Sequence, residues 1–284
     1  MKGFTIILNI FLQFLNSSAG KTALSWKPNS VESDGRTKLP TIESIIKGNR
    51  SFYRPFYVRI VAGEGLGEEK KCGGTIISVN WIVTAASCVA SHNAQAIWVH
   101  VGDFTGGDGH RELLTVSEVI VHESFNSLNH QHDIAMLRLM FPLSIEHRQH
   151  SFNLCSSNTA TTANNICTLM GTCGLGTIMA SQDIEPPNLR EIFLTETRGG
   201  VIFQRCPQGV ICTHRTSRVS QNICRGDEGG PLYLFHGDST VPRCLYGVAS
   251  YFGPDRRSRE LCNGGSFFTS VPAHYYWILS KLHQ

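Results

Sequence analysis

Short apolar runs rich in β-branched residues recur along most of the chain, and turn-forming residues separate them. They lie at 72–78, 81–85, 96–101, 113–121, 134–139, 166–171, 189–195, 231–235, 245–251 and 266–270. Because no amphipathic helical pattern intervenes, this spacing predicts an all-β barrel or sandwich. A single helix is predicted from Pro272, where Tyr275, Ile278 and Leu282 recur at helical spacing.

The composition is that of a globular chain, with 41% hydrophobic and 17% charged residues over 284 positions. The formal net charge of +3 is scattered along the sequence. Such a charge distribution does not form the basic surface of a nucleic-acid binder. We therefore expect no nucleic-acid partner.

The first 19 residues have the pattern of a secretory signal peptide. Lys2 precedes an apolar run from Phe4 to Leu15, and small residues follow up to Ala19. A run of about 12 residues is shorter than the roughly 20 that cross a bilayer, and no later run reaches that length. We expect a soluble, secreted, extracellular protein without a membrane partner. Residues 20–44 are predicted to be a polar pro-segment or linker, and whether it is cleaved stays open.

Ten cysteines lie after residue 71, and their even number in a secreted chain predicts five disulfides. No pair has the C-x-x-C spacing of zinc modules, so we expect no metal and no cofactor. His130 and His132 are metal-ligand types beside Asp133, but alternation along a strand would turn His132 away from Asp133. We interpret both histidines as surface or packing residues.

Three segments carry a resemblance to a known family. They are CGGTIISVNWIVTAASC at 72–88, HDIAMLRL at 132–139 and CRGDEGGP at 224–231. In order and spacing they resemble the active-site blocks of trypsin- and chymotrypsin-like serine proteases. With IIKG at 45–48 and YGVASYFG at 246–253, the resemblance covers residues 45–284. It implies two perpendicular six-stranded β-barrels, at roughly 45–150 and 151–271, followed by a C-terminal helix at 272–284.

The resemblance also shows where the catalytic machinery is altered. The family uses a serine nucleophile, a histidine base and an aspartate, and only the aspartate, Asp133, is kept. Ser87 stands in place of the histidine, and a hydroxyl cannot accept a proton near neutral pH. Glu228 stands in place of the nucleophile, and either loss costs about 10⁴ to 10⁶ in rate. If buried, Glu228 needs hydrogen-bond donors, and we expect Ser87 or the oxyanion-hole amides beginning with Gly226.

The substrate pocket departs from the family as well. Asn222 occupies the pocket base, where an aspartate selects Arg or Lys. Ser250, Tyr251 and Phe252 match the segment that pairs with substrate, but the third position is normally glycine. Ser266 replaces a further glycine of the pocket wall. The resemblance therefore predicts a closed pocket.

Activation in the family begins with a cut just before a segment such as IIKG. The new amino group at Ile45 would then insert beside Asp227. Ser44 precedes the cut instead of Arg or Lys. A trypsin-like activator would find no site there.

By resemblance, three disulfides are expected, Cys72 with Cys88, Cys206 with Cys212 and Cys224 with Cys262. The remaining cysteines are Cys155, Cys167, Cys173 and Cys244, which allow three pairings, and we favour Cys167 with Cys244. Asn49 begins a glycosylation sequon whose use stays open. Five arginines are interpreted as solvated loop charges: Arg54, Arg59, Arg256, Arg257 and Arg259.

The sequence thus predicts a non-catalytic serine protease homologue, an inactive pseudoprotease that acts as a binding, cofactor or decoy protein. Its partner would be a protein, such as a component of a protease cascade, that the sequence does not identify. The alternative is a weakly active serine-type endopeptidase. Oligomeric state stays open.

Overall fold

The computed structural model describes residues 48–64, 69–106, 111–158, 170–176, 186–196, 206–215, 222–235, 241–253, 262 and 264–282. The expected signal peptide, the pro-segment, Ile45 and Cys167 lie outside these residues. No helix within the described ranges is long and apolar enough to span a membrane.

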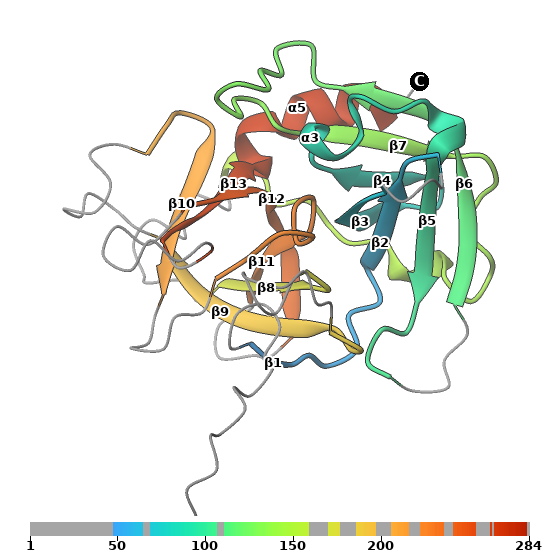
Figure 1. The fold of residues 1–284 in the computed structure, drawn as a ribbon, viewed down its shortest axis with the longest axis horizontal. Helices are drawn as coiled ribbons and strands as arrows, with labels where there is room; N and C mark the ends of the chain where they lie inside the picture. The colour runs from blue at the N-terminus through green and yellow to red at the C-terminus, as the bar shows by residue number, and fades with distance from the viewer. Residues whose placement is uncertain are drawn as a thin grey trace, which may run out of the picture. The chain divides into compact units, whose positions relative to one another are not determined.

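Six antiparallel strands form a closed barrel in the first half of the chain (Figure 1). They are β2 (Tyr57–Ala62), β3 (Lys70–Ser78), β4 (Trp81–Thr84), β5 (Ile97–Gly102), β6 (Arg111–Val121) and β7 (Ala135–Leu139), and they close in the order β2-β3-β4-β7-β6-β5. Burial alternates along β5, where Ile97, Val99 and Val101 are buried and Trp98 is exposed, because successive side chains of a strand point to opposite faces.

A second sheet follows, in the order β1-β9-β10-β13-β12-β11-β8. Its strands are β1 (Asn49–Arg50), β8 (Met170–Gly174), β9 (Arg190–Glu196), β10 (Val210–Arg215), β11 (Pro231–Phe235), β12 (Pro242–Phe252) and β13 (Ser266–Ser270). Because β8 also pairs with β9, six of these strands form a ring, to which β1 adds at β9. The prediction of an all-β chain with barrels is therefore confirmed.

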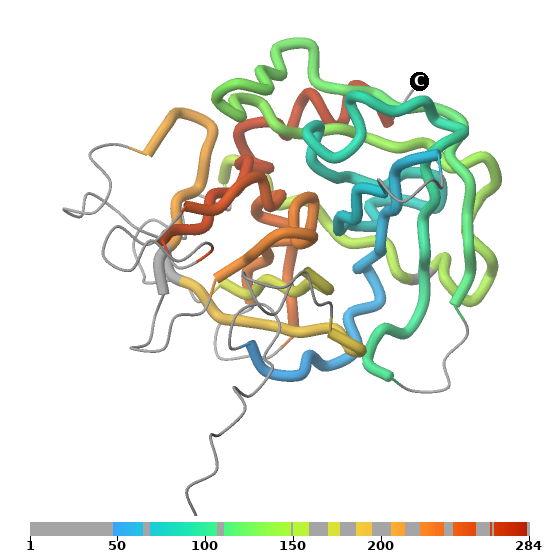
Figure 2. The backbone as a smooth tube through the Cα atoms, viewed as in Figure 1, coloured from blue at the N-terminus to red at the C-terminus, as the bar shows by residue number. Residues whose placement is uncertain are grey.

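The C-terminal helix α5 (Val271–Leu282) begins one residue before the predicted start, and it buries Val271, His274 and Ile278. The other helical segments with both ends in the described residues are short: α3 (Ala86–Val89), η1 (Ala94–Ala96) and η2 (Arg148–His150). Figure 2 shows the helix packed close to the loop that follows β6. Trp277 Nε1 donates to Glu123 Oε2 in that loop at 2.7 Å.

Two arginines interpreted as solvated charges are buried, so that interpretation is wrong for them. Arg54 is 8% exposed, and its guanidinium donates twice to Glu191 Oε1, at 3.1 and 2.6 Å. Arg59 lies in the middle of β2 and is 6% exposed, with Nη1 3.3 Å from the carbonyl oxygen of Leu175. Each charge is buried with a polar partner, which is the condition under which burial is tolerated.

The closed barrel and the second sheet, together called the two β units, meet backbone to backbone at Gly73 and Gly230. Gly73 in β3 donates its N–H to the carbonyl oxygen of Glu228 at 2.7 Å. A Cβ on Gly73 would lie 2.7 Å from Gly230 Cα, which is closer than real Cβ contacts come. Only glycine allows this approach, and it fixes the segment around Glu228 against the first barrel.

Three of the expected disulfides are present: Cys72 with Cys88, Cys206 with Cys212 and Cys224 with Cys262. The favoured pairing of Cys167 with Cys244 is wrong, because Cys244 is bonded to Cys155. Two backbone hydrogen bonds bring these cysteines together, from Cys155 N to Leu245 O at 2.9 Å and from Leu245 N to Asn153 O at 2.7 Å. Cys173 is a free, buried thiol, so the expectation of five bridges is also wrong.

Cys173 should react with a thiol reagent only after unfolding, since burial raises the pKa of its thiol well above the usual value. We expect the protein and its Cys173→Ala variant to give equal thiol counts with Ellman's reagent when folded. In concentrated urea the protein should show one more thiol per chain. A difference of one thiol before unfolding would contradict a buried Cys173.

Candidate functional site

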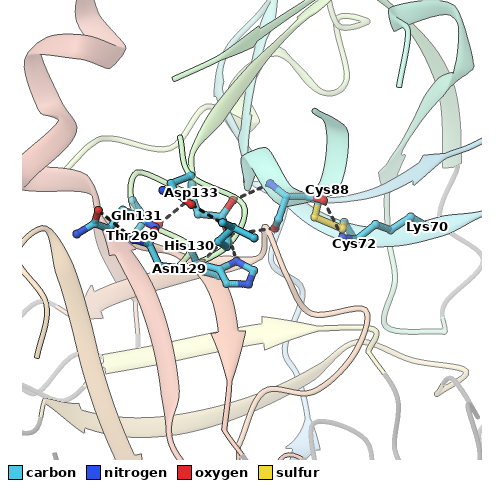
Figure 3. A network of polar contacts seen from close by, with 12 residues as sticks. Lys70, Cys72, Cys88, Asn129, His130, Gln131, Asp133 and Thr269 are labelled. Carbon is cyan, nitrogen blue, oxygen red and sulfur yellow. Dashed lines mark hydrogen bonds and ion pairs between the residues drawn. A yellow bond between two sulfur atoms is a disulfide. The ribbon is translucent and has the colours of Figure 1, made fainter. Parts of the chain in front are cut away.

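Asp133, in the loop before β7, is fully buried and holds groups from both β units (Figure 3). Its Oδ1 accepts the N–H of Ser87 at 2.7 Å, and its Oδ2 accepts the Ser87 hydroxyl at 3.0 Å. Ser250 in β12 donates its hydroxyl to the same Oδ2 at 2.6 Å. The hydroxyl of Thr269 in β13 donates to the Asp133 carbonyl oxygen at 2.8 Å. The carboxylate therefore accepts from the Ser87 N–H, the Ser87 hydroxyl and the Ser250 hydroxyl.

His130 is a neighbour of Asp133 that the sequence interpretation missed. Its Nδ1 lies 3.4 Å from Asp133 Oδ2 (Figure 3). Its ring centroid is 5.1 Å from that of Tyr251. The strand alternation assumed for this segment is wrong, since β7 begins only at Ala135 and His130 has a φ of 56°. The polar residues before Asp133 favour a turn, which is the signal that could have placed His130 here.

Glu228 is partly buried, and its carboxylate folds back onto the loop that carries it. Gly226 donates its N–H to Glu228 Oε2 at 2.6 Å, which confirms one of the two expected donors. Ser87, the other, directs its hydroxyl to Asp133 instead. Burial raises the pKa of Glu228, while the backbone amides and the positive charges of Lys70 and Arg225 oppose that rise.

Lys70 in β3 also reaches this site, although no sequence motif marked it. Its Nζ donates to the carbonyl oxygen of Ser87 at 2.7 Å (Figure 3). This contact anchors the start of α3 to β3, beside the Cys72–Cys88 bridge. Ser87 is thus held through its N–H, its hydroxyl and its carbonyl oxygen.

Asp227 is 2% exposed, and backbone amides satisfy both of its oxygens. Oδ1 accepts the N–H of Gly176 at 2.7 Å, and Oδ2 accepts the N–H of Cys224 at 2.9 Å. Burial raises the pKa of Asp227 to about 7, and these two hydrogen bonds together with Arg59 act against the rise.

The expected pocket residues lie together along β12 and β13 and just before the loop of Glu228. Asn222 and Ser266 are both inaccessible to solvent, and Ser266 Oγ donates to Asn222 Oδ1 at 3.3 Å. Among the described residues, Asn222 Nδ2 has no hydrogen-bond partner. Phe252 pairs with Ser266 across the two strands and packs against the core of the second sheet. Tyr251 stacks on Phe267 with ring centroids 4.3 Å apart.

The closed barrel and the second sheet share the buried Asp133, which accepts hydrogen bonds from both, and this arrangement agrees with a chymotrypsin-like fold. The sequence model of the trypsin family matches residues 45–278, so the chain belongs to the trypsin family. It is similar to serine protease SSP1 of Scolopendra subspinipes, with 28% identity over 85% of this chain and 87% of that protein. It is also 28% identical to chymotrypsin-like elastase family member 1 of Rattus norvegicus and of Bos taurus, over 73% of this chain and 77% of each.

The free energy of unfolding should contain a contribution from Asp227 that falls as pH rises from about 4 to about 7. The folded pKa of about 7 exceeds the ordinary value of 3.8, so the folded chain binds the extra proton between these values. Stability from this group is full below the ordinary pKa and is lost as pH rises toward the folded pKa. Urea unfolding at several pH values should give Asp227→Asn a less negative slope than the parent, by up to about 1.4 kcal/mol per pH unit. The matched variant Asp103→Asn should keep the parent slope over this range, and an unchanged slope in Asp227→Asn would contradict the assignment.

Proposed function

We propose that the protein is a secreted, non-catalytic serine protease homologue that acts as a binding, cofactor or decoy protein for a protein partner. The observation that carries the proposal is the way the site uses its own polar groups. The Asp133 carboxylate is bonded to Ser87 and Ser250, and the Glu228 carboxylate is bonded to the Gly226 amide. These contacts stabilise a folded site that lacks an activated nucleophile.

Proton transfer is the first requirement that the site does not meet. A general base needs a pKa near the working pH and a place within reach of the nucleophile. The Ser87 hydroxyl has no such pKa, and it donates its proton to Asp133. His130 is an imidazole near Asp133, but a proton acceptor has no role where the nucleophile position holds a carboxylate.

Nucleophilic attack is the second requirement. The carboxylate of Glu228 would have to form an anhydride with the acyl group of a peptide, which is less stable than the amide it replaces. Its Oε2 also accepts the Gly226 N–H, the donor that would otherwise stabilise an oxyanion. Because the Gly226 N–H already donates to Glu228, it is not free to stabilise a tetrahedral intermediate.

Substrate access is the third requirement. Ser266 donates to Asn222, and Phe252 lies opposite Ser266 across the strand pair, so side chains occupy the region of the expected pocket base. The relatives are named as a serine protease and as elastases. Weak endopeptidase activity is therefore the competing function, and Ser87, Glu228 and Phe252 all argue against it.

Secretion is part of the same proposal. Four disulfides are typical of chains that fold in an oxidising compartment. The predicted signal peptide points the same way. The partner can be identified by immobilising the mature protein, exposing it to the extracellular fluid of its source, and comparing the retained proteins with those on a heat-unfolded sample.

The mature protein should not be labelled by a fluorophosphonate probe, because no activated hydroxyl lies at the nucleophile position. Gel fluorescence and peptide mapping provide the measurement, with pancreatic elastase as the positive control. Labelling of a serine in this site that disappears on heat unfolding would contradict the proposal.

The double variant Ser87→His with Glu228→Ser should not cleave a mixed peptide library above the buffer blank. It rebuilds the triad with Asp133 but leaves Phe252 at the pocket and Ser44 at the activation site, so access and transition-state stabilisation remain deficient. Turnover is expected only after Phe252→Gly and Ser44→Arg are added and the chain is cut. Cleavage by the double variant alone, at more than about 10³ times the background, would show that only the triad had been lost.

A further inference from the structure

Three histidines meet beside α5, two from the loop between β6 and β7 and one from α5 itself. His122 directly follows β6, His132 lies in the loop before β7, and His274 lies in α5. One ring nitrogen of each lies within 4.8 Å of the others. Figure 2 shows the loop that carries the first two close to the C-terminal helix.

The hydrogen bonds of His274 prepare it to act as a ligand. Its Nδ1 lies 2.7 Å from the Ser270 carbonyl oxygen, which can only accept, so Nδ1 carries the proton. In the neutral ring Nε2 is then an acceptor, and it accepts the proton of His132 Nδ1 at 2.9 Å. Ligation by both facing nitrogens places the His132 proton on its other nitrogen, Nε2, so that each facing nitrogen offers a lone pair to the ion. A second ring nitrogen that donates to a backbone carbonyl is the usual support of a metal-bound histidine.

The spacing of the nitrogens suits a tetrahedral ion. Zinc binds imidazole nitrogen at about 2.0–2.1 Å, so two nitrogens on one tetrahedral ion lie about 3.3 Å apart. The pair formed by His132 and His274 is already near this spacing at 2.9 Å. His122 needs to move closer by about 1.5 Å from the 4.8 Å limit to reach that spacing. Its Nδ1 now accepts the Ser124 N–H at 3.1 Å, and its ring stacks on His132 and contacts His274 and Trp277, so this movement rearranges these contacts.

The surroundings also favour a cation. The nearby ammonium of Lys281 is paired with Glu123 Oε1 at 2.7 Å, which reduces its repulsion of an ion.

We propose that His122, His132 and His274 bind one Zn²⁺ ion, with water as the fourth ligand. The ion joins the loop that ends at Asp133 to the C-terminal helix. His132 has a φ of 52°, a backbone conformation that costs free energy in a residue other than glycine. Metal binding by His132 would offset the free energy cost of this backbone conformation. The site does not depend on the proposed function, because none of its residues contacts Ser87 or Glu228 among the described contacts.

The test is calorimetric titration of ZnCl₂ into tag-free, EDTA-treated mature protein at pH 7.5. One ion per chain is expected, and His132→Ala should weaken binding at least about tenfold, since it removes one of three protein ligands. His132 is exposed, so this variant is expected to fold, and circular dichroism checks that it does.

His150→Ala is the matched control, because it removes another hydrogen-bonded histidine, 3.3 Å from Nδ1 of His147, at a different place. It should leave zinc affinity unchanged. Co²⁺ added to the parent should give the strong visible absorption of a tetrahedral site, and His132→Ala should lack it. Absence of binding by the parent, equal affinity in His132→Ala, or loss of affinity in His150→Ala would each overturn the proposal.

Discussion

A carboxylate removed from water must be satisfied by donors, and Asp133 imposes this condition on the centre of the molecule. Its donors come from α3, β12 and β13, so one side chain and its carbonyl oxygen tie the first barrel to the second sheet. With serine in place of histidine at position 87, the backbone N–H and the hydroxyl of Ser87 lie on the two carboxylate oxygens. The buried carboxylate therefore has hydrogen-bond donors on both of its oxygens.

Glu228 is accommodated by a related arrangement. The loop around it is fixed by its carbonyl oxygen, which accepts the Gly73 N–H, and by Asp227, which accepts the amides of Gly176 and Cys224. Its longer side chain turns back to the Gly226 amide, a donor that this loop conformation already presents. Gly226 has a φ of 93°, which glycine adopts without strain. The loop thus holds the Glu228 carboxylate with its own backbone.

Much of this could be predicted from the sequence, since local patterns carry most of the information. The runs at 231–235 and 266–270 coincide with β11 and β13, because short apolar runs and flanking turns are local signals. Strand β2 was missed because Arg59 interrupts its apolar pattern, and only the tertiary structure shows that this arginine is buried. The bond between Cys155 and Cys244 depends on a bridge between Leu154 and Leu245, a long-range pairing that no local pattern reports.

The same distinction explains what was hidden in the site. Ser87, Asp133 and Glu228 stand in motifs of fixed spacing, whereas His130 reaches Asp133 only because the chain turns over residues 127–132. In the segment from His122 to Asp133, His132 contacts His274 of α5 and immediately precedes Asp133, whose carboxylate accepts the Ser87 hydroxyl. An ion bound at the histidines would restrict the backbone that also positions Asp133. Any rigidity gained at the helix would therefore extend along this loop to the contacts of Asp133 with Ser87 and Ser250.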